Sequence, residues 1–398
     1  MIVGAGIAGA SSAIALAPAG YRILLLDRAL FPRDKPCGEG IMPEGVQVLA
    51  ELGVLPEILA RGGVKVRGMR YWNRQGVLAQ ADFPPSPGGI SFGLVMRRYH
   101  LDNLLLERAA SFTSVTIRQG FRVTDVVQED GGVKAVGGYA VDSPNQREVF
   151  HAPLTIGTDG RRSVFHAACG LTRNVLRRKR FGVTGHLQGV EGTGSYVEVL
   201  PCPGGEIYLA PGAEGISLVA ILLEERAMHF FKGDLAARYV GFLRDVKGFR
   251  ERITKSELVP PVAAVGPLGF TIEPCYRPGL LLIGDSAGFL DPITGEGMTL
   301  ALKSVKAAVP LIKEAFAGGR FDVALAQRYA RDRFQAIEDV FRFTQLLLSI
   351  SRYGFIADRV IRRLSHDQRL FRKILGVLTG SHTYRDISLR DKVALLMG

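Results

Sequence analysis

A glycine-rich turn at the start of the chain constrains its fold more than any other feature. The turn reads GAGIAG over residues 4–9, follows the short apolar run Met1–Val3 and leads into the alanine-rich stretch Ala10–Ala17. In a strand–turn–helix unit the first glycine permits the tight turn, the second lets the backbone approach a pyrophosphate, and the third lets the helix pack on the strand. The pyrophosphate then lies on the N-terminal amides of the helix. The predicted contact residues are Gly4, Gly6, Ile7, Ala8 and Gly9.

The residues after this turn complete a β–α–β unit. Pro18 and Gly20 end the helix, and the aliphatic run Tyr21–Leu26 predicts a buried parallel strand. Asp27 follows that strand, and an acid about 20 residues beyond the glycines can accept both ribose hydroxyls of an adenosine, as FAD and NAD require. We therefore predict an α/β fold of the Rossmann type, with Asp27 and Arg28 beside the adenosine. The sequence holds one such turn, so we expect no second Rossmann domain for NADPH.

Length, cysteine content and charge narrow the class of protein. A chain of 398 residues is long enough for two or three domains. The four cysteines form no CxxC pair, which predicts no metal site and no disulfide framework and favours a cytoplasmic setting. The apolar N-terminal run has no basic segment before it, so we do not interpret it as a signal peptide. A net charge of +12 would attract an anionic substrate, an acidic electron-donor protein or an anionic lipid surface. No nucleic-acid-binding signature accompanies the charge.

Further segments carry a family resemblance that extends from Met1 to about Ala308. They are FPRDKPCGEGIMP at 31–43, RYHLD at 98–102, GTDG at 157–160, IGDSAG at 283–288 and PITGEGM at 292–298. Together they resemble the geranylgeranyl reductase family. That family belongs to the FAD oxidoreductases with the p-hydroxybenzoate hydroxylase fold, which also include aromatic hydroxylases and flavin halogenases.

The resemblance implies FAD as the cofactor. In the family the acid at Asp285 meets the ribityl chain, whose hydroxyl groups need an acceptor. The helix Thr299–Ala308 would direct its positive N-terminus at the flavin ring. Asp159 would support the site from behind, whereas His166 stands where relatives often place Arg. The residues that the resemblance assigns to FAD are Gly38, Arg98, Val123, Gly284, Asp285, Pro292, Gly295, Gly297 and Met298.

Two side chains are candidates for the chemistry. Cys37 lies in the KPCGEG segment, where the resemblance implies a thiol that donates a proton or positions an alkene. An inert, buried cysteine is the alternative. Tyr208 takes the place of an aromatic stretch in the reductases, but the tryptophan of that stretch is missing, since Trp72 is the one Trp of the chain. A core tyrosine is the alternative for Tyr208.

The predicted organisation has three parts. Residues 1–65, 96–172 and 273–325 form a discontinuous FAD-binding domain. Residues 66–95 and 173–272 form an inserted antiparallel-sheet substrate domain, with strands expected at 181–190, 196–200, 206–210 and 216–223. Residues 326–398 form a C-terminal helical region with helices at 331–348 and 356–378, and its 14 Lys or Arg against 7 Asp or Glu make peripheral membrane contact an alternative to a solvated cap.

Three functions remain open at this point. The leading prediction, which the resemblance implies, is reduction of carbon–carbon double bonds in a large apolar substrate, isoprenoid or lipid-like, by reduced FAD. The alternative is an FAD-dependent monooxygenase acting on an aromatic or lipid-like substrate. The third is an electron-transfer flavoprotein, although no cysteine pattern for an iron–sulfur cluster appears. Electrons would come from NAD(P)H without a dedicated domain or from a reduced protein donor.

Overall fold

The computed structural model describes residues 1–319 and 321–396. The predicted β–α–β start is present as β1 (Ile2–Val3), α1 (Ile7–Leu16) and β2 (Ile23–Leu26). β1 pairs in parallel with β2 on one side and with β12 on the other. They are central in a six-stranded sheet of order β18-β19-β12-β1-β2-β8. The other strands are β8 (Val115–Arg118), β12 (Thr155–Gly157), β18 (Tyr276–Arg277) and β19 (Leu280–Leu282).

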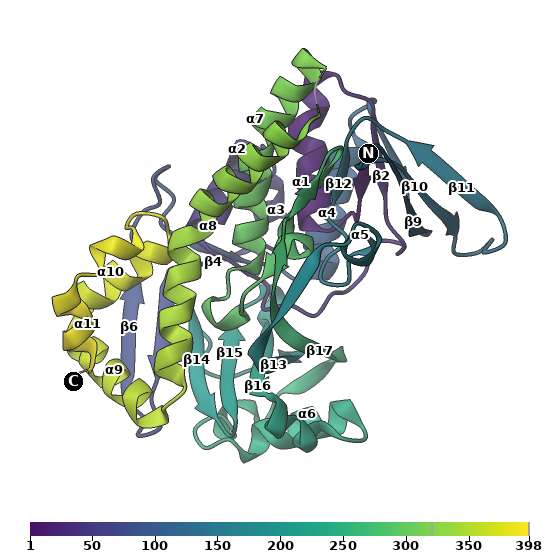
Figure 1. Ribbon diagram of the computed structural model, residues 1–398. Helices are drawn as coiled ribbons and strands as arrows, with labels where there is room; N and C mark the ends of the chain where they lie inside the picture. Colours follow the sequence, from purple (N-terminus) through teal and green to yellow (C-terminus); the bar gives the residue numbers. More distant parts are fainter. Residues whose placement is uncertain (320, 397–398) are drawn as a thin grey trace.

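Helices and two small sheets surround this sheet (Figure 1). α1 is apolar all round and almost entirely buried, because α4 and α7 pack against it. The surrounding helices are α2 (Pro43–Glu51), α3 (Leu55–Ala60), α4 (Arg98–Ala110), α5 (Val164–Ala168) and α7 (Gly297–Gly318). The small sheets consist of β3 (Gly40–Ile41), β4 (Val64–Val66) and β7 (Gly93–Val95), and of β9 (Phe121–Glu129), β10 (Gly132–Ala140) and β11 (Arg147–His151).

A second large sheet has eight strands in the order β20-β17-β13-β16-β15-β14-β5-β6. All its strand pairs are antiparallel except β14 with β5, which joins segments far apart in the sequence. The strands are β5 (Gly68–Trp72), β6 (Leu78–Asp82), β13 (Thr172–Gln188), β14 (Tyr196–Cys202), β15 (Gly205–Ala210), β16 (Ile216–Glu224), β17 (Glu257–Glu273) and β20 (Gly288–Phe289). The predicted Rossmann-like domain with an inserted antiparallel sheet is confirmed.

The eight-stranded sheet also departs from the expected strands. β13 begins at Thr172, nine positions before the predicted start at Phe181, and it carries register shifts that hide a simple alternation. β17 was not predicted, because its prolines and glycines read as turn residues. Only the extensive pairing with β13 makes this stretch a strand.

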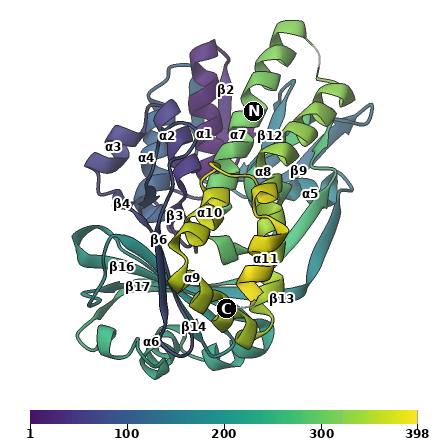
Figure 2. The ribbon, with the colours of Figure 1, turned by 90° about the vertical axis from the view of Figure 1, so that its left-hand side faces the viewer.

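Different helices pack against the two faces of this sheet. Ile207, Val219 and Ile221 pack against Tyr239 and Phe242 of α6 (Leu235–Asp245). The opposite face meets the C-terminal helices, which Figure 2 shows in front of β6 and β14. These helices are α8 (Val323–Ser351), α9 (Gly354–His366), α10 (Gln368–Leu378) and α11 (Leu389–Leu396). The predicted C-terminal helical region is confirmed, with one correction that concerns α9 and α10.

The expected single helix over 356–378 is wrong. Asp367 has non-helical backbone angles, and its carboxylate accepts the N–H of Leu370 at 2.9 Å as the N-cap of α10. An aspartate that can cap competes with continuation of a helix. The chain therefore forms α9 and α10 in place of one helix.

Three further expectations concern membrane-spanning helices, the cysteines and the division into domains. Among residues 1–319 and 321–396, no helix has the length and apolar character needed to cross a membrane. The four cysteines are free. The division into domains stays a prediction, and residues 320, 397 and 398 of its last two segments lie outside the described residues.

Candidate functional site

A cavity of about 290 Å³ lies between the dinucleotide turn and the eight-stranded sheet. Its walls come from the turn, from residues 35–42, from the segments 283–285 and 292–298, and from the inner face of the sheet. We call it the site cavity. Thirteen predicted site residues line it: Gly6, Ile7, Ala8, Cys37, Gly38, Arg98, Tyr208, Gly284, Asp285, Pro292, Gly295, Gly297 and Met298. Five others, Gly4, Gly9, Asp27, Arg28 and Val123, are not part of its lining.

The three glycines of the turn have separate roles. Gly4 has a φ of +102°, and a Cβ there would lie 2.5 Å from the carbonyl oxygen of Thr158. A Cβ on Gly9 would overlap the Gly4 carbonyl. Gly4 and Gly9 therefore allow strand and helix to pack closely, whereas Gly6 faces the cavity.

Two arginines stand over Gly6. A Cβ on Gly6 would lie 3.4 Å from Nη2 of Arg33 and 3.8 Å from Nη2 of Arg98. Asp102 holds both side chains, accepting from Nε and Nη2 of Arg98 at 2.8 and 2.7 Å and pairing with Nη1 of Arg33 at 3.0 Å. Burial by itself would raise the pKa of Asp102, but the two guanidinium groups outweigh it and hold that pKa below its ordinary value. A phosphate at Gly6 would meet two fixed guanidinium groups.

Asp27 follows β2 and lies beside the N-terminal end of α1, although it does not line the cavity. Its carboxylate accepts the N–H of Ala5 at 2.7 Å and that of Ala29 at 2.8 Å, so it is fixed against the glycine-rich turn. The strand β9 starts beside it, because the Phe121 N–H donates to the Asp27 carbonyl at 2.8 Å. Val123 follows on β9, and Arg28 is exposed. This grouping agrees with an adenosine end, and the individual contacts of Asp27, Arg28 and Val123 stay predictions.

The end of the cavity where we predict the flavin is built mainly from residues 283–298. Nζ of Lys35 lies 3.8 Å from a carboxylate oxygen of Asp285, which lines the cavity. α7 begins at Gly297, so its N-terminal amides point at the same space. Behind them, His166 Nε2 lies 2.7 Å from the carbonyl of Ser286, which ties the segment 283–288 to α5. Asp159 accepts the N–H of Val164 at 2.8 Å, and burial raises the pKa of this carboxyl.

The two candidate chemical groups both line the site cavity. Cys37 is half-buried; its Sγ accepts the N–H of Glu39 at 3.4 Å and interacts with the guanidinium of Arg98. The Tyr208 hydroxyl donates to the carbonyl of Ile293 at 3.0 Å. Burial, reinforced by the charge of Glu206, raises the pKa of Tyr208 well above its ordinary value, so this hydroxyl stays protonated at neutral pH.

The structure also brings a pair to the site that the sequence did not reveal. Glu39 is 3% exposed and has a φ of +53°. One carboxylate oxygen accepts the N–H of Arg98 at 3.1 Å and the other lies 3.0 Å from Nε2 of His186 on β13. Nothing near His186 in the sequence marked it, because the pair forms only when β13 crosses residues 35–42. Arg33 and Lys35 belonged to a quoted segment, but their charges had not been singled out.

These residues fit a flavin dinucleotide. The space over Gly6 is free of a Cβ and flanked by the buried Arg98 and the half-buried Arg33. The acid Asp285 is placed for a polyol chain, and a helix N-terminus ends at the same cavity. The model of the FAD-binding domain family matches residues 1–254, more than half of the chain. The chain belongs to the FAD-binding domain family. It is an FAD-dependent oxidoreductase, and the predicted cofactor is confirmed.

Curated relatives of this chain carry out different reactions. It is 29% identical over 386 residues to a menaquinone reductase of Mycobacterium tuberculosis, covering 89% of this chain and 84% of the relative. It is 28% identical over 317 residues to squalene epoxidase 3 of Arabidopsis thaliana, covering 77% of this chain and 58% of the relative. A digeranylgeranylglycerophospholipid reductase of Thermoplasma volcanium is 25% identical over 349 residues, covering 84% of this chain and 83% of the relative. The predicted resemblance to the geranylgeranyl reductases is confirmed.

Solved structures share the fold. A flavoprotein/dehydrogenase from Cytophaga hutchinsonii superposes with a TM-score of 0.84 at 21% identity, covering 96% of this chain and 92% of the other. A geranylgeranyl bacteriochlorophyll reductase-like protein from Thermoplasma acidophilum superposes with a TM-score of 0.70 at 20% identity, covering 99% and 94%. At these identities the comparison supports the fold and leaves the substrate open.

Proposed function

We propose that this oxidoreductase reduces carbon–carbon double bonds in a large apolar substrate such as a polyprenyl chain. One observation carries the proposal. Cys37 lines a cavity whose sheet side, including Met69, Val197 and Ala220, is apolar. A thiol that faces an apolar wall suits an uncharged alkene better than a polar aromatic acid. The likeness to a menaquinone reductase and to a digeranylgeranylglycerophospholipid reductase supports the same reaction class.

The residues of the site would share the work. Bound FAD, once reduced by NAD(P)H or a protein donor, would supply a hydride to one carbon of the double bond. The Cys37 thiol would give a proton to the other carbon, so that the product gains two hydrogen atoms. Arg98 would place a positive charge beside the sulfur left behind, and the buried Asp102 would keep that guanidinium in position. Tyr208 would close the apolar side of the cavity, in contact with substrate and bound to Ile293.

A monooxygenase is the second candidate, and the relation to squalene epoxidase 3 favours it. The chain spans 58% of the length of that relative. The same apolar cavity would suit an alkene that receives an oxygen atom. An electron-transfer flavoprotein without an organic substrate would leave Cys37 and the apolar walls unexplained.

The electron source and the setting are proposals as well. NAD(P)H binding transiently, or an acidic electron-donor protein drawn by the net charge of +12, would reduce the flavin. An apolar substrate also suggests peripheral contact with a membrane. Tyr353 and Phe355 at the start of α9, and Leu389, Val393 and Leu396 on the neighbouring α11, are exposed apolar side chains of the C-terminal helices.

The deciding experiment separates the two reactions by their products. The holoenzyme would be reduced with dithionite in the absence of air and mixed with geranylgeraniol, either without oxygen or together with ¹⁸O₂. We expect a product heavier by two hydrogens from the alkene, and no ¹⁸O in any organic product when oxygen is present. Mass spectrometry of the extracted alcohol reads both outcomes.

A variant tests the assigned proton donor in the same assay. Cys37→Ser should slow alkene reduction by about 10²-fold or more, the usual contribution of a positioned proton donor, while leaving reduction of the flavin nearly unchanged. The matched control is Cys275→Ser, since Cys275 lines neither the site cavity nor the larger cavity beside it. Incorporation of ¹⁸O by the wild type without alkene saturation would transfer the assignment to the monooxygenase.

A further inference from the structure

A second cavity, of about 380 Å³, lies on the same face of the eight-stranded sheet as the site cavity. Met69 and Val197 line the site cavity, and the next residues on the same face of the same strands, Tyr71 and Val199, line the second one. The C-terminal helices α8 to α11 cover this part of the sheet (Figure 2). The two cavities are therefore consecutive along one sheet surface.

A thin partition separates them. Tyr208 lines both cavities, and its hydroxyl donates to the Ile293 carbonyl at 3.0 Å. Ile293 faces the second cavity, whereas its neighbours Pro292 and Thr294 face the first. One side chain and one turn of backbone, joined by a single hydrogen bond, therefore divide the sheet face. A side chain held in this way can change rotamer at modest energetic cost.

A cluster of charged side chains lies next to this partition. Arg180 is buried, pairs with Asp291 at 3.1 Å and also pairs with Glu206. Arg180 and Glu206 line the second cavity, where they form its polar inner corner next to Tyr208. The partition thus has a fixed charged part and a movable aromatic part.

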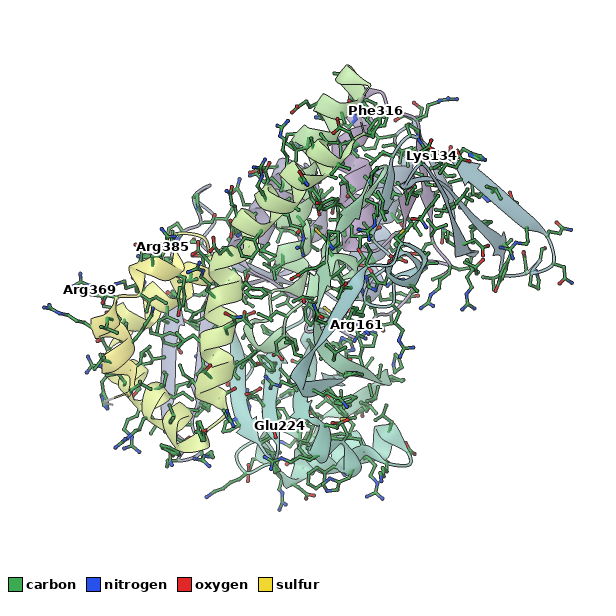
Figure 3. All side chains as sticks on the ribbon, in the orientation of Figure 1. Lys134, Arg161, Glu224, Phe316, Arg369 and Arg385 are labelled. Atoms are coloured by element: carbon green, nitrogen blue, oxygen red, sulfur yellow. The ribbon has the colours of Figure 1, made fainter. Side chains whose placement is uncertain are left out.

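The interior of the second cavity is apolar and its rim is charged. Leu346, Leu347 and Ile350 from α8 and Val360, Ile361 and Leu364 from α9 supply much of the wall. Arg226 and Arg352 are exposed at the rim, and Glu224 stands at the same end of the sheet (Figure 3). Such a lining accepts a hydrocarbon chain, because burial of polar groups without partners is costly.

We propose that the second cavity holds the distal part of an extended apolar chain, prenyl or acyl, whose other end lies in the site cavity. Tyr208 is the partition that turns aside when a long chain enters. The location of the reacting end rests on the function proposed above; the occupancy of the second cavity does not. The length of the apolar chain, rather than the head of the ligand, is then the main determinant of the ligand's affinity for the protein.

Binding of two alcohols to the oxidised holoenzyme tests this proposal without turnover. Geraniol has two isoprene units and geranylgeraniol has four; isothermal titration calorimetry gives both dissociation constants. We expect geranylgeraniol to bind at least about tenfold more tightly, since burial of the added methylene groups favours the longer chain. Oleyl alcohol, which is long and unbranched, distinguishes an acyl from a prenyl preference. The gain for geranylgeraniol over geraniol supports the proposal, and the affinity for oleyl alcohol shows only whether an unbranched chain is accepted as well.

Variants test whether the second cavity is the source of the tighter binding of geranylgeraniol. Ala357 on α9 lines only the second cavity, so Ala357→Trp should abolish the advantage of geranylgeraniol while geraniol binds as before. Leu346→Gln, which adds no bulk, should reduce the same advantage and serves if the tryptophan variant does not fold. Ala336→Trp, on a half-buried residue of α8 outside both cavities, is the control.

The outcomes separate this inference from the proposed reaction. Equal affinities for the two alcohols in the wild type, or an unchanged advantage in both Ala357→Trp and Leu346→Gln, would overturn the second-cavity proposal. A chain-length advantage that these variants remove, in an enzyme that does not saturate geranylgeraniol, would support the cavity and reject alkene reduction.

Discussion

At the scale of single residues, the site depends on a few positions with no tolerance for change. Gly4 and Gly9 are required by close backbone packing, whereas Gly6 faces the cavity at the point where we predict the pyrophosphate. Asp102 is required because two guanidinium groups share it away from water. A buried cation without its partner would be strongly destabilising. The guanidinium groups of Arg33 and Arg98 near Gly6 therefore depend on the Asp102 carboxylate.

Gly6→Val should remove FAD without unfolding the chain. The nearest atoms to a Cβ at Gly6 are the ends of the Arg33 and Arg98 side chains, at 3.4 and 3.8 Å, so a larger side chain fits the protein but occupies the path of the pyrophosphate. Flavin absorbance after gel filtration and a thermal melt measure the two effects. Gly241→Val on the exposed side of α6 is the control and should stay yellow. A Gly6→Val protein with normal FAD content would show that the dinucleotide does not pass over this turn.

Glu296 predicts a specific dependence of stability on pH. Its carboxylate oxygens have no hydrogen-bonding partner among the described residues, and burial, together with the charge of Glu44, raises its pKa well above the ordinary value despite the nearby Lys303. A raised pKa means that the folded state keeps the proton that the unfolded state loses. Its contribution to stability is therefore complete below the ordinary pKa of a glutamate and is lost as pH rises towards the folded pKa.

Glu296→Gln should remove this dependence. The variant should be more stable than the wild type at about pH 8, and the difference should shrink towards about pH 5, where both side chains are neutral in the fold. Melting temperatures across this range are the measurement. Glu251→Gln, at an exposed position, should follow the wild type. A constant offset between Glu296→Gln and wild type at all pH values would mean that Glu296 is ionised in the folded protein.

At the scale of elements, local capping decides where the C-terminal helices end. Asp367 separates α9 from α10, capping the latter through the Leu370 N–H and pairing with Arg363 at 2.9 Å. The break lets both helices face the second cavity, to which α9 contributes Val360 and Ile361 and α10 contributes Phe371.

Asp367→Ala should destabilise the cap by about 0.5–2 kcal/mol, the usual cost of losing an N-cap side chain. Asp367→Asn keeps the cap but loses the charge, so it should retain most of the stability. Urea unfolding of the three proteins gives the comparison. Equal losses for the alanine and asparagine variants would assign the effect to the Arg363 pair instead.

At the scale of the whole molecule, one sheet connects the cofactor to the C-terminal helices. At one end of the molecule, α9 and α11 carry exposed apolar residues within the basic C-terminal region 326–398. The strands β9 to β11 lie at the opposite end (Figure 1). Arg369 of α10 projects outward from the C-terminal helices, and Arg385 lies in the turn Tyr384–Asp386 between α10 and α11 (Figure 3). This asymmetry would direct an amphipathic end towards an anionic lipid surface.

Sedimentation with lipid vesicles tests that orientation. The wild type should bind vesicles that contain phosphatidylserine and bind less to pure phosphatidylcholine, with binding weakened by salt. A double variant, Phe355→Glu with Leu389→Glu, should stay in the supernatant. Val149→Glu replaces a similarly exposed apolar residue on β11 and should behave as wild type. Loss of binding in Val149→Glu alone would place the lipid-facing surface at the other end.

The sequence by itself determined the parts of this protein that depend on neighbouring residues. The turn at 4–9 with its helix and second strand is readable because a short stretch supplies all the required geometry. The DG and GD segments were found through the family resemblance, and the contacts of Asp27 and Asp285 with the cofactor stay predictions. The strands β14, β15 and β16 were also readable, since each is a short, mainly apolar segment bounded by glycine or proline turns.

Only the tertiary structure decided the contacts between distant segments. Glu39 meets His186 because β13 crosses residues 35–42, Arg33 shares Asp102 with Arg98, and β17 is a strand because β13 pairs with it. The two cavities divided by Tyr208 exist because strands from both sides of the FAD-binding segments join in one sheet. Such contacts leave no periodic pattern in either partner's sequence, since each depends on where the rest of the chain brings the other.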